Sequence, residues 1–206
     1  IKIFVLHHHQ VNYLDQTFTE SDLSVMSNAQ GLIDVLSSKG IDFVVHGHKH
    51  IPRFGMQIPT PGHPLWILCA GSFSAMLDSR HFESVGNKFH LVEFHDRCKK
   101  NKYARGVVRS WTHASGRGWM KSKSESMLDY KHSFGTYEPL PALKEKIIEI
   151  INKELSGKQY IWWSTISEKY EDIRYVGNRM LTDILKEIRK DMGILLHDIE
   201  NSDLDE

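Results

Sequence analysis

Two groups of histidines are the features of this sequence best suited to chemistry. Residues 7–9 are three consecutive histidines that directly follow a short apolar run, and His48 and His50 follow a second apolar run. Neutral imidazole is a good ligand for Zn, Mn, Fe and Ni. Two such groups, each after an apolar run, arise by chance far less often than one. The spacing therefore predicts a transition-metal site built from both groups.

The elements expected around these histidines would carry them to one edge of a sheet. Residues 1–6 (IKIFVL) and 41–45 (IDFVV) are predicted strands, the first of them buried on both faces. Between them, residues 22–39 predict an amphipathic helix with Ser21 as its N-cap and Gly40 just past its end. In such strand–helix–strand layering, ligands bind beyond the carboxyl ends of the strands.

Further strands are predicted downstream, over residues 65–70, 88–94 and 104–112. Helical periodicity then marks residues 143–155 and 178–196, and Thr165 would begin a capping box between them.

The predicted fold class is α/β (α+β), divided into three parts. Residues 1–115 hold the predicted strands, and residues 140–206 form a helical appendix. Residues 116–139, which begin with a stretch rich in Gly, Ser and Lys, are expected to be a linker.

Composition and charge exclude several classes of protein. Hydrophobic residues make up 40% and charged residues 25%, as in ordinary globular domains. Lys plus Arg equals Asp plus Glu, at 26 each, so the net charge does not support a nucleic-acid partner. Cys69 and Cys98 lack metal-binding spacing, which favours a reducing, cytoplasmic location. No run reaches the roughly 18 apolar residues of a membrane span, so no membrane partner is expected.

Three pieces of the sequence, taken in order, resemble the closing half of the catalytic domain in calcineurin-like metallophosphoesterases. They are VLHHH (residues 5–9), VVHGHKH (44–50) and AGSFSA (70–75), and the resemblance covers about residues 1–115. It implies part of a four-layer αββα sandwich with a dinuclear metal centre. The implied activity is hydrolysis of phosphomono- or phosphodiesters by a hydroxide that two metals activate.

The resemblance also implies roles for individual histidines. His7 and His48 would bind one of two divalent ions (Mn, Zn, Fe, Ni or Mg), and His50 would bind the second. His7 is preferred to His8 because it is the first residue after the strand. His8 and His9 are candidates for contacting the substrate phosphate, with ordinary loop positions as the alternative.

The opening motifs of that family, Asp-x-His, Gly-Asp-x-x-Asp and Gly-Asn-His-Asp, do not occur in this sequence. In family order they precede the region with which this chain begins. We therefore expect an N-terminally truncated fragment with no assignable catalytic proton donor. Alone, it is expected to bind metal weakly and to hydrolyse little.

Two other functions remain open at this point. His7, His48 and His50 would also suit one zinc ion in a mononuclear tri-histidine protein. Alternatively, the metal site is degenerate and the chain is a non-enzymatic module whose C-terminal helices bind a protein partner. The resemblance leaves the phosphorylated substrate open among phosphomonoesters, cyclic nucleotides, phosphoproteins and DNA ends.

Basic and aromatic residues outside the resemblance allow two interpretations each. Arg117, Lys121 and Lys123 suit either contact with nucleic acid or a solvated loop. Trp162 and Trp163 are expected in a helical core rather than in base stacking.

Overall fold

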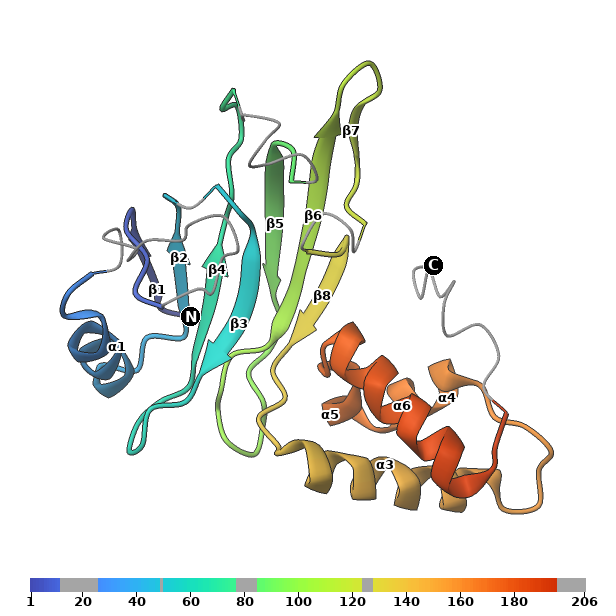
Figure 1. Ribbon diagram of the computed structural model, residues 1–206. Coiled ribbons are helices and arrows are strands. Elements are labelled where there is room, and N and C mark those ends of the chain that lie inside the picture. Colours follow the sequence, from blue (N-terminus) through green and yellow to red (C-terminus); the bar gives the residue numbers. More distant parts are fainter. Residues whose placement is uncertain (12–25, 49, 77–84, 124–127, 196–206) are drawn as a thin grey trace. The chain divides into compact units, whose positions relative to one another are not determined.

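The computed structural model of the chain describes residues 1–11, 26–48, 50–76, 85–123 and 128–195 (Figure 1). The chain splits into two compact units, Ile1–His132 and Ser133–Glu206. The described residues form eight strands, in two sheets, and five helices. The predicted mixed α/β class is therefore confirmed.

Sheet A brings the carboxyl ends of three strands to one edge. Its order is β1 (Ile3–Leu6), β2 (Phe43–His46), β4 (Leu65–Cys69) and β3 (Arg53–Gln57). The first three strands are parallel, with Leu6 opposite His46 and His46 opposite Cys69. The loops that follow these strands therefore leave the sheet side by side, as the sequence predicts.

Helix α1 (Ala29–Ser38) covers one face of sheet A. Ile33 and Leu36 are buried in one cluster with apolar residues of β2 and β4. The helix ends as predicted, because Gly40 has the left-handed φ of +64° that suits a residue just past a C-terminus.

Helix α1 begins at Ala29, so the single helix predicted from residue 22 is wrong, and residues 22–25 lie outside the described part of the chain. Residues 26–28 are not helical, and the Met26 N–H is held by the carbonyl of His9 at 3.3 Å. The Ala29 N–H donates to the Met26 carbonyl at 3.1 Å, which closes a turn just before the helix. Periodicity alone does not reveal this turn. Ser21 lies outside the described residues.

Strand β1 is not buried on both faces, so that prediction is wrong. Ile3 is 50% exposed and Val5 is 70% exposed, while Phe4 and Leu6 pack against the α1 cluster. β1 is the last strand at its end of sheet A. An apolar run indicates a strand, but it does not indicate whether a second layer extends as far as an edge strand.

Sheet B lies against the other face of sheet A (Figure 1). It comprises β5 (Lys88–Phe94), β6 (Gly106–Ala114), β7 (Gly118–Lys121) and β8 (Lys131–Phe134), with β8 paired to β6. The ring of Phe94 meets that of Phe43 edge-on at 5.3 Å between the sheets. Helix α1, sheet A and sheet B are thus three successive layers, and a fourth layer stays a prediction.

The segment predicted to be a linker over residues 116–139 instead contains β7 and β8. Gly116 and Gly118 have φ angles of +75° and +77°, which close a tight turn between β6 and β7. The glycines that suggested a linker are therefore hairpin residues, and the boundary between the compact units lies at 132/133 rather than near 115.

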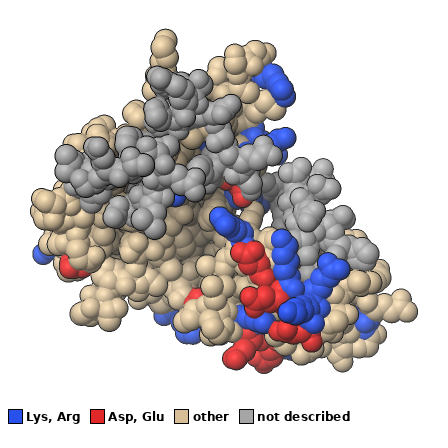
Figure 2. Space-filling view, in the orientation of Figure 1, with Lys and Arg blue, Asp and Glu red and all other residues tan. Residues whose placement is uncertain are grey.

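The second unit is helical. It contains α3 (Leu140–Leu155), α4 (Trp163–Lys169), α5 (Glu171–Arg174) and α6 (Asn178–Met192). Its core is formed by aliphatic residues of all four helices, among them Leu143, Ile147, Ile166, Ile173 and Ile188. Over this unit acidic and basic side chains are interleaved (Figure 2), as in the ion pairs of Lys144 with Glu187 and Asp191.

Two details of this unit differ from expectation. Helix α4 begins at Trp163, so Thr165 lies within the helix and is not an N-cap. Trp163 packs against the core as predicted, but Trp162 is 69% exposed. Among the described helices, none has the length and apolar character needed to cross a bilayer.

Candidate metal centre

Backbone hydrogen bonds hold the three loops together at the carboxyl edge of sheet A. The Gly47 N–H donates to the His7 carbonyl at 3.2 Å, and the Ala70 N–H donates to the His46 carbonyl at 2.9 Å. These bonds continue the parallel ladder by one residue beyond each strand. The side chains that follow the strands are therefore fixed relative to one another.

His7 and His48 are brought into direct contact at this edge. His7 Nε2 lies 3.0 Å from His48 Nδ1. The ring of His8 is close to both, with its centroid 4.6 Å from that of His48 and 5.1 Å from that of His7. The two clusters predicted from the sequence do meet.

The separation of the His7 and His48 nitrogens fits a shared cation. Metal–nitrogen bonds of about 2.1 Å place two ligand nitrogens about 3.0 Å apart at the right angle of an octahedral ion, and about 3.4 Å apart around a tetrahedral one. Without an ion, the same distance suits an N–H···N hydrogen bond in which one ring donates and the other accepts. These residues therefore fit as part of a metal site.

The backbone at both predicted ligand positions after β2 is left-handed. His48 has φ of +72° and His50 has φ of +58°. In the described residues, Lys102 is the one other non-glycine residue with positive φ. Such conformations cost free energy and cluster at functional sites, although histidine tolerates them better than most residues.

His50 is turned toward a partner that the sequence did not reveal. Its Nδ1 makes a short hydrogen bond with Ser72 Oγ, from the loop after β4. Gly71, in the same loop, has φ of +69°, a left-handed conformation that favours glycine. The glycine lets the chain turn so that Ser72 reaches His50.

The loop after β4 is in turn fastened to sheet B. The Lys88 N–H donates to the Ser72 carbonyl at 2.6 Å. His90 Nε2 donates to the Ala70 carbonyl at 2.8 Å, and its Nδ1 contacts Ser110 Oγ at 2.8 Å. Ser72 and His50 are thus positioned by both sheets of the sandwich.

Burial and neighbouring imidazoles keep the central histidines neutral. Burial, then the nearby charges of His8 and His7, lowers the pKa of His48 below its ordinary value. Burial lowers the pKa of His46 to about 4, while its Nδ1–H donates to the Gly47 carbonyl at 3.1 Å. Neutral imidazole is the form that binds metal ions. His48 is suited to be a ligand, and His46 stiffens the turn beneath it.

The remaining predicted residues divide into exposed and buried groups. His8 is exposed, as a substrate contact must be. His9 is fully buried, and its ring centroid lies 6.2 Å from those of both His46 and His48. Across the described ranges, no three His, Cys, Asp or Glu side chains converge in the arrangement of a complete metal site.

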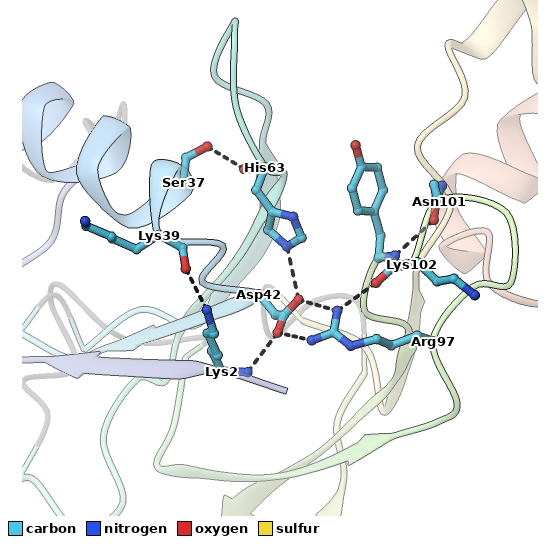
Figure 3. Close-up of polar contacts among 9 residues, drawn as sticks. Lys2, Ser37, Lys39, Asp42, His63, Arg97, Asn101 and Lys102 are labelled. Atoms are coloured by element: carbon cyan, nitrogen blue, oxygen red, sulfur yellow. Dashed lines mark hydrogen bonds and ion pairs between the residues drawn. The ribbon is translucent and has the colours of Figure 1, made fainter.

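A second polar cluster lies at the opposite end of β2 and was not predicted (Figure 3). Asp42, whose side chain is fully buried, accepts hydrogen bonds from Arg97 at 2.6 and 2.8 Å and from the backbone N–H of Lys2 at 2.8 Å. His63 Nε2 donates to the same carboxylate at 3.0 Å. Burial alone would raise the pKa of Asp42, but these bonds outweigh it and lower that pKa.

Comparison of the sequence with protein-family models and with curated proteins found no match. The carboxyl edge of sheet A, with His7, His8, His48 and His50, is called the histidine edge below. Its function must therefore be inferred from its residues and their geometry.

Proposed function

We propose that the carboxyl edge of sheet A is part of the centre of a metal-dependent phosphoesterase. The observation that carries this proposal is the 3.0 Å contact between His7 Nε2 and His48 Nδ1, made by the first loops after two adjacent parallel strands. A loop of polar residues needs no such convergence. A metal site shared by two loops does, because its ligands must converge on one point.

The residues of this edge would have different roles in binding metal and substrate. His7 and His48 would hold one divalent cation, and His50 a second one. If His50 Nδ1–H donates to Ser72 Oγ, the lone pair of Nε2 would face the cation. His8, exposed beside these rings, would orient a substrate phosphate.

When bound, two divalent cations supply charge stabilisation at phosphorus and lower the pKa of an attacking water. This chain's own contribution is positioning. Neutral His48 presents a lone pair without first losing a proton, since its pKa lies below its ordinary value. The left-handed backbone at His48 and His50 holds both rings at the edge instead of letting them extend into solvent.

The test combines metal stoichiometry with turnover. For the longest translated form of the reading frame that contains this sequence, we expect two Mn²⁺ per chain and Mn²⁺-dependent hydrolysis of bis-p-nitrophenyl phosphate. His48→Ala should abolish both, and His95→Ala, which alters a histidine paired with Glu93 away from this edge, should change neither.

Other results would assign the site differently. One cation per chain would favour the mononuclear tri-histidine site. Unchanged metal content after His48→Ala would contradict any metal role for this edge. For the 206-residue chain alone, measurable Mn²⁺-dependent turnover would contradict the expectation that it is inactive by itself.

A further inference from the structure

An aromatic surface begins one residue after Ser72. Phe73 is 65% exposed and stacks on Trp119 of β7, with centroids 5.4 Å apart and planes 20° apart. Trp119 is itself 40% exposed. The ring nearest to the histidine edge thus belongs to a surface that extends over sheet B.

Other rings fix Trp119 in place. Phe89 meets it edge-on at 5.0 Å, and His113, opposite Trp119 in the β6–β7 ladder, does so at 5.3 Å. Phe89 also stacks on Trp111, with centroids 4.7 Å apart and planes 8° apart. These rings lie on the face of sheet B that points away from sheet A, because the alternate residues Lys88, His90 and Phe94 face inward. We call this group of Phe73, Phe89, Trp111 and Trp119 the aromatic face.

Positive charge borders the aromatic face. Residues 115–123 contain Arg117, Lys121 and Lys123 and no acidic residue. Lys121 places its ammonium 4.5 Å from the ring centre of Tyr130. In the upper right of Figure 2, where Figure 1 places the β6–β7 hairpin, the charged atoms are Lys and Arg. The one acidic side chain of β5, Glu93, is paired with Arg109 and His95.

We propose that the aromatic face binds the bases of a single-stranded nucleic acid and delivers its phosphodiester backbone to the histidine edge. Single strands expose the flat faces of their bases, and exposed aromatic rings next to basic side chains are what such strands bind. A duplex hides those faces. The delivery step rests on the proposed phosphoesterase function, whereas the binding step does not.

Two features of the sequence, its balanced net charge and its predicted linker, have a different interpretation if this surface binds nucleic acid. The balanced net charge does not support a nucleic-acid partner, but charge is not evenly distributed. Acids and bases are mixed over the helical unit, whereas residues 115–123 carry three basic side chains and no acidic one. The predicted linker, residues 116–139, contains strand β7, which carries Trp119 on the same face as Trp111.

Binding is tested by fluorescence anisotropy with a labelled oligo(dT) of about 15 nucleotides, a length within the usual range of single-strand sites. EDTA is present so that no metal-dependent cleavage occurs. Trp119→Ala and Phe73→Ala should each weaken binding by roughly 5- to 100-fold, the effect of losing one stacked base. Trp119→Phe should retain most of the affinity. Lys121→Ala should reduce the slope of log affinity against log salt by about 0.7.

The matched control is Trp162→Ala, which removes a tryptophan of the helical unit that is even more exposed than Trp119 and should leave binding unchanged. Thermal unfolding of each variant checks that it folds. Three results would overturn the proposal: no oligo(dT) binding at low salt, equal effects of Trp119→Ala and Trp162→Ala, or equal affinity for a duplex of the same length. Self-association lost in Trp119→Ala without oligo(dT) binding would assign the face to a second copy of the chain instead.

The two proposals fail in different ways. If oligo(dT) binds through Trp119 but the longest translated form hydrolyses no phosphodiester, the phosphoesterase proposal fails and the binding surface stands. If bis-p-nitrophenyl phosphate is hydrolysed but Trp119→Ala changes neither oligo(dT) binding nor its cleavage, the aromatic face has another role and the phosphoesterase proposal stands.

Discussion

Strand β2 carries a polar cluster at each end, and the two clusters are opposite in kind. At its amino end, the Asp42 carboxylate is surrounded by donors from Arg97, His63 and the backbone of Lys2 (Figure 3). At its carboxyl end, roughly 13 Å away along the strand, His48 meets other imidazoles, which are groups of its own type.

The difference separates a structural cluster from a candidate site. Donors and an acceptor that satisfy one another leave no capacity for a ligand, so the Asp42 cluster stabilises the fold by tying together β1, the loop of His63 and the loop after β5. Imidazoles that face one another gain most when a cation comes between them. Mutations at the amino end of β2 should therefore lower the free energy of unfolding, whereas mutations at its carboxyl end should lower the metal affinity.

The largest expected effect is on the Asp42 cluster. Asp42→Ala should lower the free energy of unfolding by about 3 kcal/mol, because it removes the carboxylate that Arg97, His63 and Lys2 share. Urea denaturation would measure the change. Metal binding should be unaffected.

Asp34→Ala is the matched control, because Asp34 is an exposed carboxylate bonded to Gln30 on α1. It should change stability by no more than about 0.5 kcal/mol. Equal effects of the two substitutions would mean that the Asp42 cluster contributes no more than a surface contact.

Acid should weaken the two ends of β2 in different pH ranges. The pKa of His46 falls to about 4 through burial, whereas in the unfolded chain it is about 6.5. Between these values the unfolded state binds more protons, so stability decreases as pH falls, by about 3 kcal/mol in total. The pKa of Asp42 is also lowered, so its contribution is lost only as pH falls below the ordinary value of 3.8.

Urea denaturation at several pH values from about 7 to about 4 would measure this decrease. His46→Gln removes one titrating group and should reduce the pH dependence in that range, to which the lowered pKa values of His48, His90 and His132 also contribute. An unchanged slope in this variant would show that His46 is not its source.

Sequence patterns predicted the strands and the histidine clusters better than the hydrogen bonds that position individual side chains. The strand–helix–strand unit and the two histidine groups follow local periodicity, so β2, β4 and the meeting of His7 with His48 were foreseen. Ser72 was not, because its role depends on a loop after β4 reaching His50 across 22 positions. The same holds for Asp42, whose partner Arg97 is 55 positions away.

The β6–β7 hairpin shows a further reason for failure. Gly116 and Gly118 suit both a linker and a tight turn, and only the pairing of β7 with β6 decides between them. The exposure of Val5 and Trp162 likewise depends on which layers surround them. The residues next to them in the sequence do not determine those layers.

A smaller effect is expected at Ser72, which links the carboxyl-end cluster to sheet B. Ser72→Ala removes the hydrogen bond that orients His50 and should weaken Mn²⁺ binding by roughly 10- to 100-fold. Stability should fall by only about 1 kcal/mol. Isothermal titration calorimetry would measure the affinity.

Ser72→Thr keeps the hydroxyl and should restore most of the Mn²⁺ affinity, and Ser74→Ala changes an exposed serine of the same loop and should have no effect. If Ser72→Thr binds Mn²⁺ as poorly as Ser72→Ala, packing at this position matters and the hydrogen bond does not.

The smallest expected change in stability is also the sharpest test of the comparison. His48 has φ of +72°, a conformation that costs a residue with a Cβ about 1–2 kcal/mol, while glycine adds an entropic cost of about 0.5–1 kcal/mol. Without metal, His48→Gly should therefore leave the free energy of unfolding unchanged or raise it by about 0.5 kcal/mol, while Mn²⁺ binding is lost. His95→Gly, at a residue without positive φ, should lower stability. If His48→Gly is instead destabilising in EDTA, contacts rather than a ligand hold His48 in its strained conformation, and the carboxyl end of β2 would be a structural cluster like that of Asp42.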